Sequence, residues 1–132
     1  MAAKSVAEKL LLRPGGRAWV SDDARAGLLG SLPEGATMVR SPAEADVAIV
    51  VVDSASSVRS ALDAHAADLG GPAAFWVAYP KGNRADINRD SLWPLLAEHG
   101  FRPVSQVALD ETWSALRFRP LKAGEAPFNP GG

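Results

Sequence analysis

The sequence predicts a three-layer α/β domain in which helices cover both faces of a mostly parallel sheet that ends in an antiparallel β-hairpin. Helix-like and strand-like segments alternate from residue 17 to residue 100, and this alternation is typical of a parallel sheet. Two of the strand-like segments are almost wholly apolar, as strands buried on both faces are. The last two strand-like segments have no helix between them, so we expect them to pair antiparallel at the edge of the sheet.

The first third of the chain contains short elements divided by turns. Ser5, with Glu8 three residues later, fits a capping box at the start of a short amphipathic helix. The segment Arg13-Pro14-Gly15-Gly16 ends that helix, because proline cannot continue it and the glycines allow a turn. The expected elements are a helix within 1–12, a strand at 17–21, a helix at about 23–30, a turn at 32–35, a strand at 37–40 and one helical turn at 41–44.

The rest of the chain carries stronger signals. Six consecutive apolar residues between Asp46 and Asp53 predict a strand buried on both faces. We expect Pro94 to fall in the first turn of its helix, where the missing N–H costs nothing. The remaining elements are a helix at 54–69, a strand at 74–80, a polar loop at 81–89, a helix from Asn88 or Asp90 to about 99, and strands at 101–110 and 113–119.

Length and composition limit the class of protein. The 132 residues are 47% hydrophobic and fit a single domain over 1–120, followed by a tail over 121–132 that we expect to be extended or disordered. The chain contains no Cys, which excludes disulfides and thiol catalysis. The two His residues do not stand in His-x-x-x-His or His-Asp spacing, so we expect no metal site.

Charge and hydropathy limit the partners. The formal net charge is −1, which gives no reason to expect nucleic acid as a partner. No apolar run is long enough to cross a bilayer, so no membrane partner is expected. Glu8 and Lys9 interrupt the stretch where a secretory signal would need apolar residues, and we therefore expect a cytoplasmic protein.

The order of the strand-like segments resembles a Rossmann-type methyltransferase. Residues 12–20 are similar to the approach to the first strand of that fold, and residues 46–53, residues 74–80 and the terminal hairpin are similar to its later strands. The resemblance implies a shortened version that lacks at least one strand–helix unit.

A second resemblance covers nearly the whole chain. Five short blocks, in this order and spacing, resemble a small bacterial family known only as a domain of unknown function. The resemblance implies a bacterial, cytoplasmic, single-domain α/β protein and brings no activity with it. The blocks are Leu12-Arg-Pro-Gly, Leu32-Pro-Glu-Gly, Ala45-Asp-Val, Trp76-Val-Ala-Tyr-Pro-Lys81 and Asp110-Glu-Thr-Trp-Ser-Ala-Leu-Arg117.

The turn after the first strand argues against a bound cofactor. A dinucleotide or adenosylmethionine site needs small residues there, so that the backbone can approach the ligand. The chain instead reads Ser21-Asp22-Asp23-Ala24-Arg25-Ala26-Gly27, in which the acids would repel a phosphate. We therefore predict no cofactor and interpret these acids as helix caps. If a nucleotide does bind, an uncharged ribose against Asp22 or Asp53 is the better match.

The polar loop after the strand at 74–80 is the richest candidate for a binding site. It leaves a buried strand at its carboxyl end, where open α/β sheets bind ligands. Its Lys and Arg side chains could hold a carboxylate or a phosphate, although the loop could equally be solvated and held by its own turn hydrogen bonds. The side chains concerned are Lys81, Asn83, Arg84, Asp86, Asn88 and Arg89.

Tryptophan and acidic residues supply the other candidates. Trp93 and Trp113 adjoin element ends and are candidates for a dimer or partner surface, with burial in the core as the alternative. Asp53 has the position of a catalytic acid but could also cap the next helix. Asp110 with Glu111 could form a general-base pair, although acids between two hairpin strands are usually turn residues.

Two hypotheses of different class follow. The first is a non-enzymatic binding or interaction module with no catalytic residue, whose surface is the 81–90 loop with Trp93 and the hairpin, and which can pair as a homodimer through the hairpin edge. The alternative is a small-molecule-binding enzyme or sensor with an anion-recognising site at the carboxyl ends of the strands. The candidate binding residues are Asp22, Asp53, Lys81, Asn83, Arg84, Asp86, Arg89 and Trp93.

Overall fold

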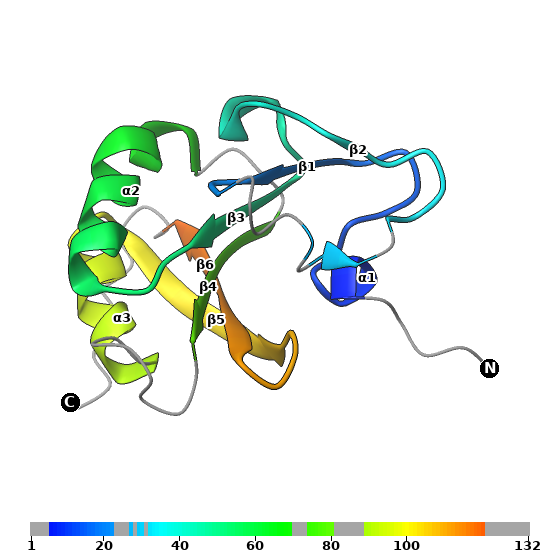
Figure 1. Cartoon of the computed structure of the whole chain (residues 1–132). Coiled ribbons are helices and arrows are strands. Elements are labelled where there is room, and N and C mark those ends of the chain that lie inside the picture. The colour runs from blue at the N-terminus through cyan, green and yellow to red at the C-terminus, as the bar shows by residue number, and fades with distance from the viewer. Residues whose placement is uncertain are drawn as a thin grey trace.

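One sheet contains all six strands of the part of the chain that the structure describes, in the order β2-β1-β3-β4-β6-β5 (Figure 1). The first four strands pair in parallel, whereas β6 pairs antiparallel with both β4 and β5. The predicted fold class, including the closing antiparallel hairpin, is confirmed. The strands are β1 (Arg17–Val20), β2 (Thr37–Met38), β3 (Val47–Val51), β4 (Ala74–Pro80), β5 (Phe101–Ala108) and β6 (Trp113–Pro120).

Helices lie on both sides of this sheet. The structure, a computed structural model, describes residues 6–22, 27, 29–30, 32–69, 74–80 and 89–120, without the side chains of 66, 67, 89–91 and 93. In Figure 1 the helices α2 (Ala55–Leu69) and α3 (Arg89–Ala97) lie together on one side, and the short helix α1 (Val6–Lys9) lies on the other. A 3₁₀ turn, η2 (Pro42–Glu44), precedes β3, and the Ser41 hydroxyl caps it by accepting the Ala43 N–H.

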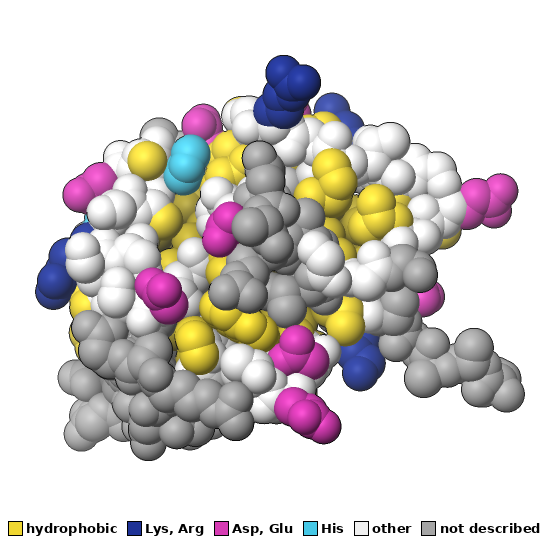
Figure 2. Space-filling view, in the orientation of Figure 1, with side chains coloured by type: hydrophobic (Ala, Val, Ile, Leu, Met, Phe, Trp, Pro, Cys, Tyr) yellow, Lys and Arg dark blue, Asp and Glu magenta, His cyan; other side chains and the backbone are white. Residues whose placement is uncertain are grey.

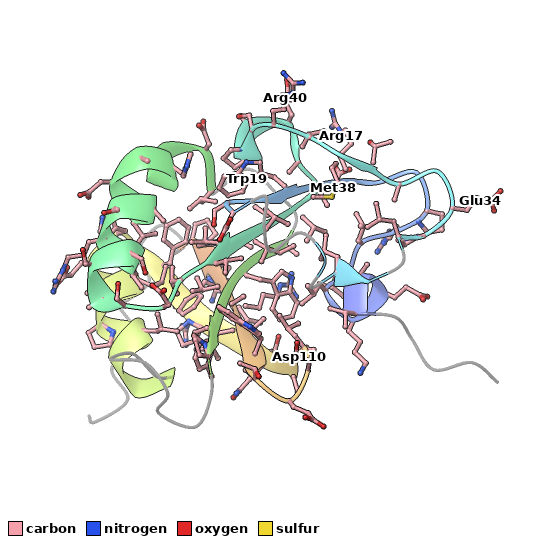
Figure 3. All side chains as sticks on the ribbon, viewed as in Figure 1. Arg17, Trp19, Glu34, Met38, Arg40 and Asp110 are labelled. Atoms are coloured by element: carbon pink, nitrogen blue, oxygen red, sulfur yellow. The ribbon has the colours of Figure 1, made fainter. Side chains whose placement is uncertain are left out.

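The face of the sheet under α2 and α3 carries one half of the core. Alternate residues of the buried strands point to it, as the two-residue period of a strand requires. Trp19 points from β1 toward α2 (Figure 3), and its ring meets that of His65 edge-on at 4.8 Å between centroids. Trp19 is therefore a core residue. Others on this face are Val50, Val52, Leu62, Phe75, Val77, Leu92 and Phe118.

The opposite face carries the second half of the core and holds α1. Trp76 is 1% exposed and its indole N–H donates to the Leu10 carbonyl at 2.9 Å. This bond satisfies a carbonyl at the end of α1 that has no partner within the helix. Trp76 is thus both a core residue, as predicted, and the anchor of the first helix. Its neighbours on this face include Leu12, Val20, Leu29, Val47, Ile49 and Ala115.

Several predicted boundaries need correction. The first helix is only four residues long, and Ser5, its predicted cap, lies outside the described residues. Pro94 is inside α3, which begins at Arg89, so it falls in the second turn and not in the first. There its ring removes a hydrogen bond of the helix interior, and the prediction that it costs nothing is wrong. The predicted helix at 23–30 lies largely outside the described residues, and the tail at 121–132 lies wholly outside them.

The viewed face mixes apolar, acidic and basic side chains (Figure 2). Among the described residues, no helix combines the length and the apolar character needed to cross a membrane.

Candidate functional site

The strand order places a crevice at the carboxyl ends of β1 and β3. From β1 the chain moves outward to β2, and it then passes back to β3 on the other side of β1. The connections that leave β1 and β3 therefore run in opposite directions, and the gap between them is where open α/β sheets bind ligands. The residues that follow these two strands are the first to consider as a site.

Ser21 joins the two strand ends at the base of this crevice. Its hydroxyl accepts the backbone N–H of Val51 at 2.8 Å, and its own N–H donates to the Ile49 carbonyl at 2.9 Å. The backbone pairing of β1 with β3 ends at Val20 and Ile49. The hydroxyl of Ser21 then continues the hydrogen bonding between the two segments. Asp22, the next residue, is placed at the mouth of the crevice by this contact.

Asp53 enters the same crevice from the end of β3. The sequence left open whether Asp53 caps the following helix, and the structure gives that role to Ser54. The Ser57 N–H donates to the Ser54 hydroxyl at 3.0 Å, and the Ser54 N–H donates to the Ser57 hydroxyl at 3.0 Å. This reciprocal pair is a capping box with serine in both positions. The Asp53 carboxylate stands outside the box, 3.4 Å from the Ser57 hydroxyl.

A cavity of about 230 Å³ opens between these groups. It brings together Asp22 and Asp53, two residues that are 31 positions apart in the sequence and that we predicted as binding residues. Its described lining contains two carboxylates, a hydroxyl and an indole, and no basic side chain. Such a lining attracts hydroxyl and ammonium groups and repels phosphate. The lining residues are Asp22, Val51, Val52, Asp53, Ser57 and Trp113.

Trp113 reaches this cavity from the hairpin. It begins β6 and pairs with Pro80 at the end of β4, because β6 runs antiparallel to β4 and so starts at the carboxyl edge. The side chain is 8% exposed and belongs to the core on the α1 side of the sheet, so the core alternative of the sequence analysis is confirmed; Trp113 also borders the crevice. Sequence reasoning missed Trp113 and Ser57 as members of this site. The expected hairpin did not indicate Trp113, because its place depends on which strand of the hairpin pairs with β4.

Asp110 holds the turn that presents Trp113. Its carboxylate accepts the backbone N–H groups of Thr112 and Trp113, each at 2.7 Å, and it lies in the turn between β5 and β6 (Figure 3). A carboxylate that accepts bonds from the following backbone is the usual arrangement of an Asp turn. The turn interpretation of Asp110 is confirmed, and its role in the site is to position the backbone of Trp113.

A partly buried polar cluster joins β4, β5 and β6 next to the crevice. The Gln106 amide donates to the Tyr79 hydroxyl and to the Ser114 hydroxyl, each at 3.1 Å. The Ser114 hydroxyl in turn donates to the Val107 carbonyl at 3.2 Å. Tyr79 and Ser114 are 3% and 2% exposed, so these bonds satisfy groups that water cannot reach. The cluster links the three strands at the edge of the sheet where β4 and β5 end and β6 begins.

The remaining candidates lie beyond what the structure describes. The predicted binding residues Lys81, Asn83, Arg84 and Asp86 fall in the segment 81–88, outside the described residues. Arg89 and Trp93 belong to α3, but their side chains are outside the described set as well. Their assignment to a ligand or partner site stays a prediction. Among the described residues, no group of three or more His, Cys, Asp or Glu side chains could hold a metal ion.

Comparisons with known proteins support the fold. A protein of the NADB-Rossmann superfamily from Streptococcus agalactiae superposes with a TM-score of 0.56 and 12% identity, over 98% of this chain and 72% of that one. The M1A22 tRNA methyltransferase TrmK of B. subtilis superposes with a TM-score of 0.54 and 13% identity, over 96% of this chain and 72% of that one. The core is therefore Rossmann-like and similar to that of a methyltransferase, as the first resemblance implied.

Sequence comparisons add nothing to this. No family model matches the chain, and no curated protein matches it. The resemblance to a bacterial domain of unknown function stays a prediction.

Proposed function

We propose that this chain is a non-enzymatic binding module on a methyltransferase-like core, and that its ligand is a small molecule without phosphate held in the crevice between β1 and β3. One observation carries the proposal, namely that the carboxylates of Asp22 and Asp53 share a single cavity with the indole of Trp113. This cavity lies at the switch in strand order, where sheets of this class bind their ligands.

The chemistry of the lining selects the ligand. Carboxylates accept hydrogen bonds from neighbouring ribose hydroxyls and attract ammonium groups, and they repel phosphate oxygens. Trp113, which is 8% exposed, adds a small apolar area to this lining, and that area suits the edge of a base or another flat apolar group. A volume of about 230 Å³ is below the usual range for whole drug-sized ligands. A nucleoside fits these requirements better than a nucleotide or a dinucleotide.

Calorimetric titration with adenosine, adenosine monophosphate and S-adenosylmethionine tests the proposal. We expect adenosine to bind, and the monophosphate and S-adenosylmethionine to bind at least about tenfold more weakly. Asp53→Asn keeps the shape of the side chain and removes its charge, so it should weaken adenosine binding by about tenfold. Asp68→Asn, an exposed residue at the far end of α2, is the matched control and should change nothing.

Two results would overturn the proposal. Adenosine could fail to bind the intact protein, or it could bind Asp53→Asn and the parent protein equally well. In the first case the ligand class is wrong, and in the second the ligand lies elsewhere.

Methyl transfer to RNA is the second candidate function. It is favoured by the likeness of the fold to that of TrmK, whose name states that activity. It is disfavoured by the residues that follow β1, because Ser21–Gly27 contains a single glycine where nucleotide-binding sheets of this class have several. Formation of S-adenosylhomocysteine from S-adenosylmethionine in the presence of tRNA would establish methyl transfer and replace the binding-module proposal.

A further inference from the structure

A second cavity lies at the opposite edge of the sheet from the crevice. Its volume is about 380 Å³, which is within the usual range for small-molecule sites. Gly16 and Ala74 lie at the amino ends of β1 and β4, and Asp46 directly precedes β3. Arg117 lies in the second half of β6, which runs the other way and so ends at this same edge. The lining residues are Leu11, Arg13, Gly16, Asp46, Ala74 and Arg117.

The charge of this cavity is opposite to that of the crevice. Two guanidinium groups line it, from the exposed Arg13 and the half-buried Arg117. The one carboxylate in the lining, Asp46, is already engaged by Arg17, since it accepts the Arg17 backbone N–H at 2.9 Å and lies 3.8 Å from the Arg17 Nε. Guanidinium groups recognise carboxylates through paired N–H donors. The cavity therefore suits an anion of low charge.

Leu11 gives the same cavity an apolar wall, in an unusual backbone conformation. Its φ is +75°, the one positive value for a non-glycine among the described residues. The Leu11 N–H donates to the Glu8 carbonyl and the Leu12 N–H to the Ala7 carbonyl, each at 3.0 Å. These two bonds form a Schellman motif that ends α1, with leucine at the left-handed position where glycine is usual.

Leucine in this conformation destabilises the fold, and its side chain adds little stabilising burial. A side chain in the left-handed region is strained, and that of Leu11 is 46% exposed and so gains little from burial. Non-glycine residues that are held in such a strained backbone conformation are found at functional sites. Leu11 lines this cavity and also the adjoining one of about 420 Å³, in which Leu12, Pro14 and Pro33 continue the apolar wall.

We infer that the amino edge of the sheet is a second binding site, for a small monoanionic carboxylate that carries an apolar chain or ring. The carboxylate lies between Arg13 and Arg117, and the apolar group lies on Leu11 and extends toward Pro14 and Pro33. A dianion is disfavoured because three carboxylates, those of Asp46, Glu8 and Glu34, also border the two cavities. This site is independent of the crevice between β1 and β3, and either could fail without the other.

Nuclear magnetic resonance titration with 4-phenylbutyrate, and with 4-phenylbutyramide as its neutral analogue, tests the inference. We expect the acid to shift the backbone signals of Gly16, Ala74 and Arg117, and the amide to bind at least about tenfold more weakly. Arg13→Gln should weaken binding of the acid by about tenfold. Arg59→Gln, at an exposed position on α2, is the matched control and should have no effect.

Leu11→Gly separates a binding role from a structural one. Glycine relieves the strained backbone, so the variant should have a Tm equal to or above that of the parent protein, while binding 4-phenylbutyrate several-fold more weakly. A structural role alone would leave binding unchanged. The inference is overturned if the acid does not bind, if the amide binds equally well, or if neither Arg13→Gln nor Leu11→Gly weakens binding.

Discussion

The hydroxyl of Ser21 accepts a hydrogen bond from the backbone N–H of Val51 at 2.8 Å. This contact joins the ends of β1 and β3 at the point where the strand order reverses, and it places Asp22 beside Asp53. The crevice thus depends on a serine that follows a strand, where the sequences of nucleotide-binding sheets have glycines. The Ser21 side chain also occupies space at the base of the crevice that a glycine would leave open.

Ser21→Ala should destabilise the junction between the ends of β1 and β3. The partly buried Val51 N–H would lose its acceptor, and an unsatisfied buried donor costs about 1–3 kcal/mol. We expect the free energy of unfolding to fall by about 1 kcal/mol or more, as measured by urea denaturation. Ser60→Ala, an exposed serine on α2, is the control. Equal urea midpoints for Ser21→Ala and the parent protein would show that the contact does not support the junction.

Trp76→Phe should detach α1 from the sheet. Phenylalanine fills much of the same buried space but cannot donate to the Leu10 carbonyl, which Trp76 reaches at 2.9 Å. We expect a loss of about 1–3 kcal/mol in stability. Hydrogen exchange should be faster at Leu10, Leu11 and Leu12. Unchanged exchange at these amides would mean that packing alone holds the helix.

Pro94→Ala should stabilise the protein. Pro94 is exposed and lies in the interior of α3, where proline removes one helix hydrogen bond and costs about 3 kcal/mol in an otherwise regular helix. Because the helix has already adapted to the proline, we expect a gain of about 1 kcal/mol, seen as a higher Tm. A lower Tm would indicate that the proline is matched to its surroundings.

Pairing through the hairpin edge remains our prediction for the oligomeric state. β5 is the outer strand, and its Val104 is 48% exposed, although Pro103 and the register shift between Pro103 and Ser105 interrupt the edge. We expect a dimer in sedimentation velocity that Val104→Lys converts to monomer. A single species of 13.8 kDa for the parent protein would refute the dimer.

The sequence correctly predicted those elements whose bounds are set by the residues next to them in the chain. The strand at 74–80 has the bounds that were predicted, because an apolar run between glycine-rich and polar segments defines its own ends. Pro94 was misplaced because the start of α3 depends on the residues before it, and several candidates there would serve as caps. The helix at the N-terminus is shorter than expected, since its end is set by a Schellman motif that requires Leu11 to take an unfavourable conformation.

The site was predictable only in part, and for a similar reason. Asp22 and Asp53 each follow an expected parallel strand, so their common edge could be inferred from the order of elements. Trp113 joins them only because β6 inserts between β4 and β5, and this choice depends on long-range pairing. That Arg13 and Arg117 line one cavity at the amino edge depends on the same insertion.

A chemical-shift titration of the protein with adenosine tests the central claim most directly, because it locates the ligand as well as detecting it. The account predicts saturable shifts in the backbone signals of Ser21, Asp22, Asp53 and Ser57 and in the indole signal of Trp113, with Gly16 and Ala74 unchanged. Shifts confined to the amino edge, or no shifts at saturating adenosine, would contradict it.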